Sequence, residues 1–152
     1  MIFQQIFLGS DHRGFEQKEH LKTALTPKYS VVDCGPTTFD PADDYNDAAI
    51  RVAQAVLTAA APSCGILLCG SAHGIAIQAN RFRGIRAIVG YNSELARLGR
   101  EHNNANILCL SADHTPVDQL EQIIETFLAT DFSNQSRHIK RNQRLDQESH
   151  ND

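Results

Sequence analysis

The stretch Gly65-Ile66-Leu67-Leu68-Cys69-Gly70 decides the fold of this chain. Its residues before Gly70 are apolar without alternation, which is typical of a strand covered on both faces, as in a parallel sheet. Gly70 breaks the run, and the apolar residues Ile75, Ile77 and Ala79 predict that a helix follows. A buried strand that passes through a glycine-flanked turn into a helix indicates an α/β architecture.

Other apolar segments extend this pattern in both directions. We expect further strands near residues 6–8, 29–34, 86–89 and 106–110, and helices after the first and third strands and near residues 46–61, 93–100 and 116–129. Strands that alternate with helices imply a three-layer, Rossmann-like open sheet of about five parallel strands with helices on both faces. The polar segment 37–44 is expected to be a loop.

Two of these helices carry boundary signals. In the helix near residues 46–61, apolar residues recur at helical spacing, and Pro62 is expected to end it. In the helix near residues 116–129, Thr115 is expected to cap the first turn and Pro116 to occupy its first position. Together these elements predict a single α/β domain over residues 1–132, followed by a basic, partly helical C-terminal tail over residues 133–152.

Composition excludes several classes of protein. The chain has 152 residues, 41% of them hydrophobic, and a net charge of −4, which suits one globular domain and argues against a nucleic-acid binder. No stretch approaches the ~18 apolar residues of a membrane span, and the first residues lack the pattern of a secretory signal. The four cysteines form no C-x-x-C pair, so we expect free thiols in the reducing cytoplasm.

The candidate chemistry lies where strands end, because ligands of open α/β sheets bind beyond the carboxyl ends of the strands. Ser10-Asp11-His12 follows the first strand, the segment 69–74 follows the third, and Arg100 to Asn104 precede the fifth. In the segment 69–74, amides of a tight turn that opens a helix favour an anion. We expect the same amides and the helix dipole to favour the thiolate of Cys69. A base beside an anion hole suits a reaction that passes through an enediolate.

Each of these residues also has a structural interpretation. Cys69 could be a core thiol, Asp11 could simply cap the following helix, and His12 and His102 could be solvated or structural histidines. In the tail, Arg137, Arg141 and Arg144 would share one face of a helix. That face could be solvated, could hold a phosphate or could contact RNA. The residues alone leave these interpretations open.

Several known motifs do not match. A phosphate-binding P-loop would need lysine where Ser71 stands, and the dinucleotide fingerprint G-x-G-x-x-G is absent. A cysteine phosphatase loop would need arginine at the position of Ile75. His73 lies near Cys69, but no pair of ligands has zinc-site spacing, so no metal is expected. A small phosphorylated or anionic metabolite remains as the expected ligand.

Several separate motifs, in order, resemble the ribose-5-phosphate isomerase B family, which also holds the lactose-pathway galactose-6-phosphate isomerase subunits. The resemblance extends from about Ile6 to about Arg144. Its carriers are Gly9-Ser10-Asp11-His12-Arg13-Gly14-Phe15, Asp33-Cys34-Gly35, Asp44-Tyr45, Ile66-Leu67-Leu68-Cys69-Gly70-Ser71, Asn80-Arg81-Phe82-Arg83-Gly84-Ile85-Arg86-Ala87, Arg100-Glu101-His102-Asn103 and Asn106-Ile107-Leu108.

The resemblance implies an aldose–ketose isomerase that interconverts ribose 5-phosphate and ribulose 5-phosphate through an enediolate, in the pentose phosphate pathway, without a metal or organic cofactor. It implies that Cys69 is the base that moves a proton between C1 and C2, with Ser71 beside the enediolate. It implies that His102 opens the furanose ring, with Asp11 assisting. The substrate-binding residues that it implies are His12, Tyr45, Gly70, Ala72, His73, Gly74, Asn103, Arg137 and Arg141.

The same resemblance implies a shared site. Within the family, two subunits build each site, and the partner supplies the segment around His102 and the arginine tail. We therefore expect a homodimer, or a tetramer, in which the tail packs on the partner subunit. Neither nucleic acid nor a membrane is expected as a partner.

The chain departs from the family pattern at three places. Ala72 stands where glycine is usual, so the turn must avoid positive φ or accept strain. Asn46 stands where proline is common, and Ala112-Asp113 stands where many members carry a phosphate-binding arginine. We expect Asp113 to point away from the phosphate or to pair with Arg137 or Arg141. These departures leave two alternatives, an isomerase of another sugar phosphate such as a hexose 6-phosphate, and a non-catalytic sugar-phosphate-binding module.

Overall fold

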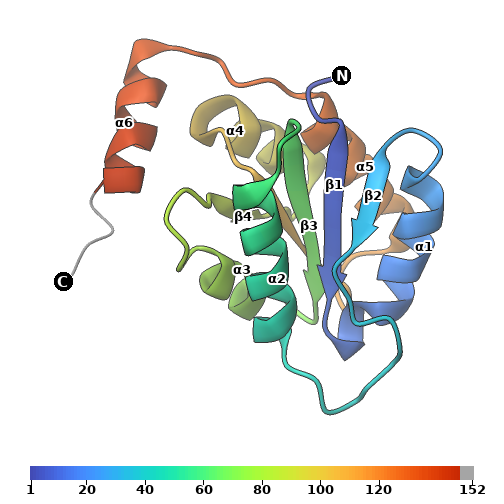
Figure 1. Ribbon diagram of the computed structural model, residues 1–152. Helices are drawn as coiled ribbons and strands as arrows, with labels where there is room; N and C mark the ends of the chain where they lie inside the picture. The colour runs from blue at the N-terminus through green and yellow to red at the C-terminus, as the bar shows by residue number, and fades with distance from the viewer. Residues whose placement is uncertain (148–152) are drawn as a thin grey trace.

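A five-stranded parallel sheet organises the protein in the computed structural model, which describes residues 1–147 (Figure 1). The strand order is β2-β1-β3-β5-β4. In the centre of the sheet Leu8 pairs with Ile66, and Ile66 pairs in turn with Leu108. The strands are β1 (Gln5–Ser10), β2 (Ser30–Asp33), β3 (Ser63–Cys69), β4 (Ala87–Val89) and β5 (Ile107–Ser111).

Helices connect successive strands, and two more helices follow the last strand. A short 3-10 helix, η1 (His12–Gly14), precedes α1. The α-helices are α1 (Phe15–Leu25), α2 (Tyr45–Thr58), α3 (His73–Ala79), α4 (Ser93–Asn103), α5 (Val117–Ala129) and α6 (Ser136–Gln147). Within residues 1–147, no helix combines the length and the apolar character needed to cross a bilayer.

The core divides into two apolar layers, one on each face of the sheet. Ile66 and Leu68 of β3 pack with apolar residues of α1, α4 and α5, whereas Leu67 and Cys69 pack with α2 and α3. Figure 1 shows α2 and α3 in front of the sheet. The absence of polar alternation in β3 therefore has the expected cause, because helices cover both sides of the strand. The predicted three-layer, parallel α/β fold is confirmed.

Three helix boundaries differ from the sequence expectations. The helix expected to run to Pro62 ends at Thr58, because Ala59 is already extended. The prediction that Thr115 caps the helix is wrong, since Pro116 holds the cap position of α5 and no side chain caps that helix. The helix expected over residues 93–100 continues to Asn103 and ends where Asn104 adopts a left-handed conformation. Asparagine tolerates that conformation well at a helix end.

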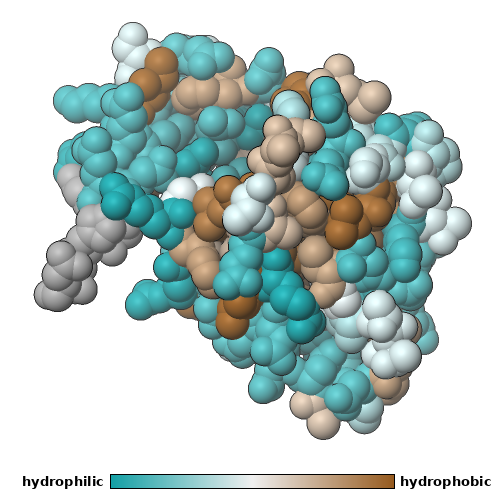
Figure 2. Space-filling view, in the orientation of Figure 1, coloured by the Kyte–Doolittle hydropathy of each residue, from teal (hydrophilic) through white to brown (hydrophobic). Residues whose placement is uncertain are grey.

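The C-terminal tail forms α6, which packs against α4 of the same chain. Asn142 Nδ2 donates to the His102 carbonyl at 3.2 Å, and the His138 ring lies 4.4 Å from the His102 ring. Arg86 Nη1 contacts both carboxylate oxygens of Asp146 at 3.0 Å. Figure 2 shows that α6 presents a mostly hydrophilic surface, with few apolar side chains. Residues 148–152 of the expected tail lie outside the described residues.

The topology places the carboxyl ends of β1 and β3 side by side at a reversal of strand order. From β1 the chain moves to β2 on one side and then to β3 on the other side. A crevice forms beyond the strand ends at such a switch point, because the connections leave in opposite directions. The segments that follow β1, β3 and β5 therefore meet at this edge.

Candidate active site

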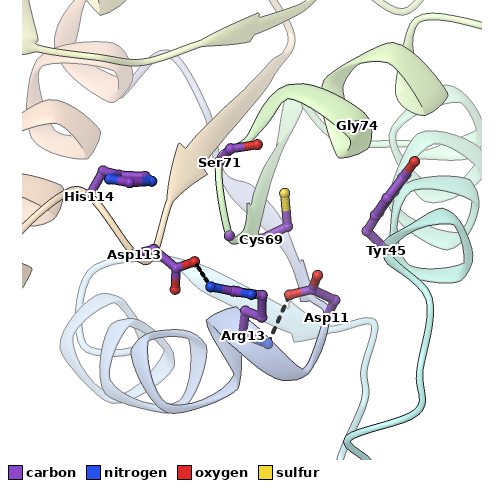
Figure 3. A pocket seen from close by; sticks show the side chains of 9 residues that line it. Asp11, Arg13, Tyr45, Cys69, Ser71, Gly74, Asp113 and His114 are labelled. Atoms are coloured by element: carbon purple, nitrogen blue, oxygen red, sulfur yellow. Dashed lines mark hydrogen bonds and ion pairs between the residues drawn. The ribbon is translucent and has the colours of Figure 1, made fainter.

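A cavity of about 350 Å³ opens at this edge of the sheet (Figure 3). Its walls come from the segments after β1, β3 and β5 and from the first residue of α2. The lining residues are Asp11, Arg13, Tyr45, Cys69, Gly70, Ser71, Gly74, Asp113 and His114. Six of them, Asp11, Tyr45, Cys69, Gly70, Ser71 and Gly74, are among the site residues expected from the sequence.

Cys69 is the thiol of this cavity. The residue is only 4% exposed, yet it lines the cavity at the end of β3. The Ala72 amide donates to its sulfur at 3.2 Å. Burial raises the pKa of Cys69 above its ordinary 9.0, and this effect outweighs the amides of Ala72, Ile75 and Ser71, which lower the pKa. The turn amides thus favour the thiolate of Cys69, as expected, but burial opposes it and has the larger effect on the pKa.

The turn after Cys69 is held tightly by its neighbours. The Gly70 carbonyl accepts from Ser111 Oγ at 2.6 Å and from the Asp113 amide at 3.2 Å. Ala72 takes φ 70°, so the turn accepts the left-handed conformation that glycine would adopt without strain. A Cβ on Gly74 would lie 2.5 Å from Tyr45 Cζ, so only glycine lets the Tyr45 ring pack at this place.

Asp11 has the capping role considered for it and also lines the cavity. Its Oδ1 accepts from the Arg13 and Gly14 amides at 3.0 and 3.2 Å and so caps the short helix η1. Figure 3 shows the second carboxylate oxygen on the side of Cys69. Burial raises the pKa of Asp11, against the lowering effect of the two amides. Asp11 in turn raises the pKa of Cys69 by its negative charge.

His12 and His73 lie beside the cavity and do not line it. His12 Nδ1 lies 2.8 Å from Asp43 Oδ1, and the same oxygen accepts from the His12 amide. This contact raises the pKa of His12. The His73 ring is paired with Tyr91, whose hydroxyl lies 3.1 Å from Nε2. Both histidines are thus engaged with side chains outside the lining of the cavity.

Four expected site residues lie elsewhere in the chain. His102 and Asn103 close α4, just before the amino end of β5, and Arg137 and Arg141 are exposed on α6. The cavity lies beyond the carboxyl ends of the strands, so one chain does not bring these residues to Cys69. Burial lowers the pKa of His138, and the charges of His102, Arg137 and Arg141 add to this effect.

Sequence reasoning missed two cavity residues and misplaced the partner of a third. Arg13 and His114 line the cavity, although neither was selected as a site residue. Asp113 pairs with Arg13 and not with Arg137 or Arg141. Their positions in the sequence could have indicated Arg13 and His114, because residues just after the first and fifth strands of a parallel sheet must reach the same edge.

The cavity thus combines a thiol, two carboxylates, two hydroxyls, an imidazole, a guanidinium and turn amides. These groups can transfer protons and hold a small anionic molecule. Residues 1–147 contain no group of three or more His, Cys, Asp or Glu side chains arranged to hold a metal ion.

Comparison with known proteins adds independent evidence. The family model described as Ribose/Galactose Isomerase matches residues 6–145. The "Probable ribose-5-phosphate isomerase B" of Mycoplasma pneumoniae is 40% identical over 137 residues, which cover 90% of this chain and 89% of that protein. The ribose-5-phosphate isomerase B of Escherichia coli is 34% identical over 139 residues, with 91% of each chain covered.

Solved structures agree with these matches. A ribose 5-phosphate isomerase from Thermotoga maritima has a TM-score of 0.89 and 42% identity, covering 94% of this chain and 97% of that one. Ribose-5-phosphate isomerase B from Mycoplasma genitalium, solved with bound ribulose-5-phosphate, has a TM-score of 0.90 and 36% identity, with 95% of both chains covered. From the extent of the family match and the identity to these relatives, the chain belongs to the ribose/galactose isomerase family.

Proposed function

We propose that this protein is an aldose–ketose isomerase that interconverts ribose 5-phosphate and ribulose 5-phosphate. One observation carries the proposal. The Cys69 thiol opens onto a cavity beside a turn of backbone amides, in a chain similar to the Mycoplasma genitalium enzyme solved with ribulose-5-phosphate. Isomerisation needs a base next to two adjacent carbons and donors for the oxygen that becomes negative.

The proton balance of the reaction fits these groups. The Cys69 thiolate takes the proton from C2 of the open-chain aldose, and the electron pair of that bond forms the enediolate. The Cys69 thiol then returns a proton to C1 and gives the ketose. Ser71 is the hydroxyl that we place beside O1 and O2, where a proton must move between the two oxygens. Burial raises the pKa of Cys69, and the amides of the turn, which lower that pKa, are the main support of the thiolate.

A second copy of the chain completes the site in this proposal. The expected ring-opening residue His102, the sugar contact Asn103 and the phosphate contacts Arg137 and Arg141 all lie away from the cavity. The exposed position of both arginines on α6 supports their use by a neighbouring subunit. We therefore infer a homodimer, or a tetramer built from it, in which residues 133–147 serve the partner's site. The free cysteines Cys34, Cys64, Cys69 and Cys109 support a cytoplasmic location.

Isotope exchange tests the activity directly. The protein is incubated with ribose 5-phosphate in deuterated water with a chelator, and ketose formation and deuterium uptake at carbon are followed by NMR. We expect turnover with exchange in the wild type and a loss of roughly 10²–10⁴-fold in Cys69→Ala. Cys34→Ser, a thiol variant outside the cavity, serves as the matched control and should keep the full rate.

Three results would contradict the proposal. Full activity in Cys69→Ala would show that Cys69 is not the base. Ribose 5-phosphate binding without any exchange in the wild type would indicate a binding module. Faster turnover of a hexose 6-phosphate than of ribose 5-phosphate would transfer the assignment to that substrate.

A further inference from the structure

Arg13 gives the cavity its fixed positive charge. Among the nine lining residues, Arg13 is the one lysine or arginine, and it stands with two carboxylates, Asp11 and Asp113. Figure 3 shows its side chain along the floor of the cavity, below Cys69 and between the two aspartates. A phosphorylated substrate that enters this cavity meets two negative groups, so its dianionic end needs a cation within the same walls.

Arg13 is held from several sides without being buried. Its backbone amide is bound by Asp11, and its Nη2 donates to Asp113 Oδ2. A Cβ on Gly70 would lie 2.9 Å from Arg13 Nε and 3.0 Å from Asp113 Oδ2, so the pair lies directly against this glycine. Gly70 is itself fixed through its carbonyl by Ser111 and by the Asp113 amide.

The guanidinium keeps donors for a ligand. The Arg13 side chain is 56% exposed, compared with 30% for the Asp113 side chain. In the described part of the chain, Nη2 alone makes the hydrogen bond to Asp113, which leaves Nε and Nη1 able to donate. Arginine stays charged at all ordinary pH values, so this group cannot act as an acid or a base. Its contribution to a reaction in this cavity is electrostatic.

We propose that Arg13 binds the phosphate of the substrate from within the same subunit as Cys69, and that Asp113 and Gly70 position its guanidinium. This inference rests on the proposed function. The planar fork of arginine matches two phosphate oxygens, which a point charge does not. Asp113 does not repel the phosphate because Arg13 compensates its charge. Asp113 is thus a positioning residue, and any phosphate contact from a second copy adds to Arg13.

Steady-state kinetics with ribose 5-phosphate test the assignment through the split between KM and kcat. Arg13→Gln should raise KM, and the inhibition constant of inorganic phosphate, by roughly ten- to a hundredfold, and should leave kcat nearly unchanged. Arg13→Lys should lie between the wild type and Arg13→Gln, because an ammonium lacks the fork. Asp113→Asn should raise KM less than Arg13→Gln does. Lys28→Gln, which removes one exposed charge outside this cavity, is the matched control and should change neither constant.

The opposite results would overturn the inference. A KM and a phosphate inhibition constant within about twofold of wild type in Arg13→Gln would make the ion pair a surface feature of no consequence for binding. A fall in kcat with an unchanged KM would assign Arg13 to the chemical step and would also contradict it.

A binding measurement separates this inference from the proposed function. Inorganic phosphate that binds the folded protein raises its thermal midpoint. We expect that rise in the wild type and its loss in Arg13→Gln, whether or not the protein turns over ribose 5-phosphate. Absence of turnover in the wild type would therefore defeat the proposed function alone. An equal rise in both proteins would defeat the assignment of Arg13 alone.

Discussion

The Ala72 amide donates to the Cys69 sulfur at 3.2 Å from a residue whose φ is 70°. The donor to the thiol therefore depends on a left-handed residue that carries a Cβ. Left-handed backbone is unfavourable for side chains other than those of glycine, asparagine and aspartate, and most unfavourable for β-branched ones. The conformation of this turn is thus linked to the protonation of Cys69.

Substitution of Ala72 tests this link. Ala72→Val should lower the free energy of unfolding by about 2 kcal/mol or more, because the residue is fully buried and has positive φ. It should also lower kcat by displacing the amide. Ala72→Gly relieves strain of about 1 kcal/mol but removes a buried methyl worth about 0.8 kcal/mol, so its stability should stay near that of the wild type. Urea unfolding measures the stability of both variants. An Ala72→Val variant as stable as the wild type would contradict this account.

Alkylation measures the titration of Cys69. Iodoacetamide reacts with thiolates, and in a Cys34→Ser background Cys69 is the reactive thiol, because Cys64 and Cys109 are fully buried. Since burial raises the pKa of Cys69 above 9.0, its alkylation rate should rise about tenfold per pH unit from pH 7 to 9. Ribose 5-phosphate should protect it. A rate that levels off below pH 8 would show a thiolate favoured by the turn instead.

Asp11 provides the control for that titration. Its negative charge raises the pKa of Cys69, so Asp11→Asn should move the alkylation profile to lower pH. Asparagine caps helices as well as aspartate does, so the short helix η1 should persist. An unchanged profile would mean that the charge of Asp11 does not affect the pKa of Cys69.

The sequence predicts the fold correctly where its hydrophobic pattern reflects the packing of the core. The run from Gly65 to Cys69 predicted a strand covered on both faces, and the two core layers explain why it carries no polar positions. The rule that ligands bind at the carboxyl edge predicts chemistry at the strand ends that carry Asp11, Cys69 and Ser71, and these three residues line one cavity.

Sequence reasoning failed where a local rule competes with tertiary contacts. The turn amides and the helix dipole were expected to favour the thiolate of Cys69, but burial raises its pKa, and the depth of burial is not visible in a spacing. The pairing of Arg13 with Asp113 joins residues 100 positions apart, which only the sheet order brings together. Helix α4 continues through His102 and ends at the left-handed Asn104, without the proline or glycine that usually marks a helix end in a sequence.

A buried lysine provides a test of stability. Lys18 has no exposed side-chain surface, and its Nζ lies 2.8 Å from Asp33 Oδ2, which also accepts from Lys22 at 2.9 Å. Lys18→Ala should lower the free energy of unfolding by about 2–4 kcal/mol, through the lost pair and the cavity that remains. Lys22→Ala, at a position 41% exposed, is the matched control and should cost at most about 1 kcal/mol. Equal losses would contradict a special role for burial.

The same ion pairs predict an acid dependence of stability. Burial of Asp33 raises its pKa, but the hydrogen bonds from Lys18, Lys22 and the Gly35 amide prevail and hold the pKa below its ordinary 3.8. The native state therefore binds fewer protons than the unfolded state near that pH, so this stabilisation is complete above pH 3.8 and is lost as the pH falls below it. The stability difference between wild type and Lys18→Ala should shrink over that range in urea titrations. A constant difference would contradict the linkage to Asp33.

Subunit complementation tests whether two chains build each site. Cys69→Ala and His102→Ala should each be inactive alone, because every site in either homodimer lacks one of the two groups. When the two variants are unfolded together and refolded, a mixed dimer combines Cys69 of one chain with His102 of the other in one of its two sites. Random pairing then predicts recovery of about a quarter of the wild-type activity. If a single chain supplied both groups, the mixture would stay inactive, since no chain in it carries Cys69 and His102 together.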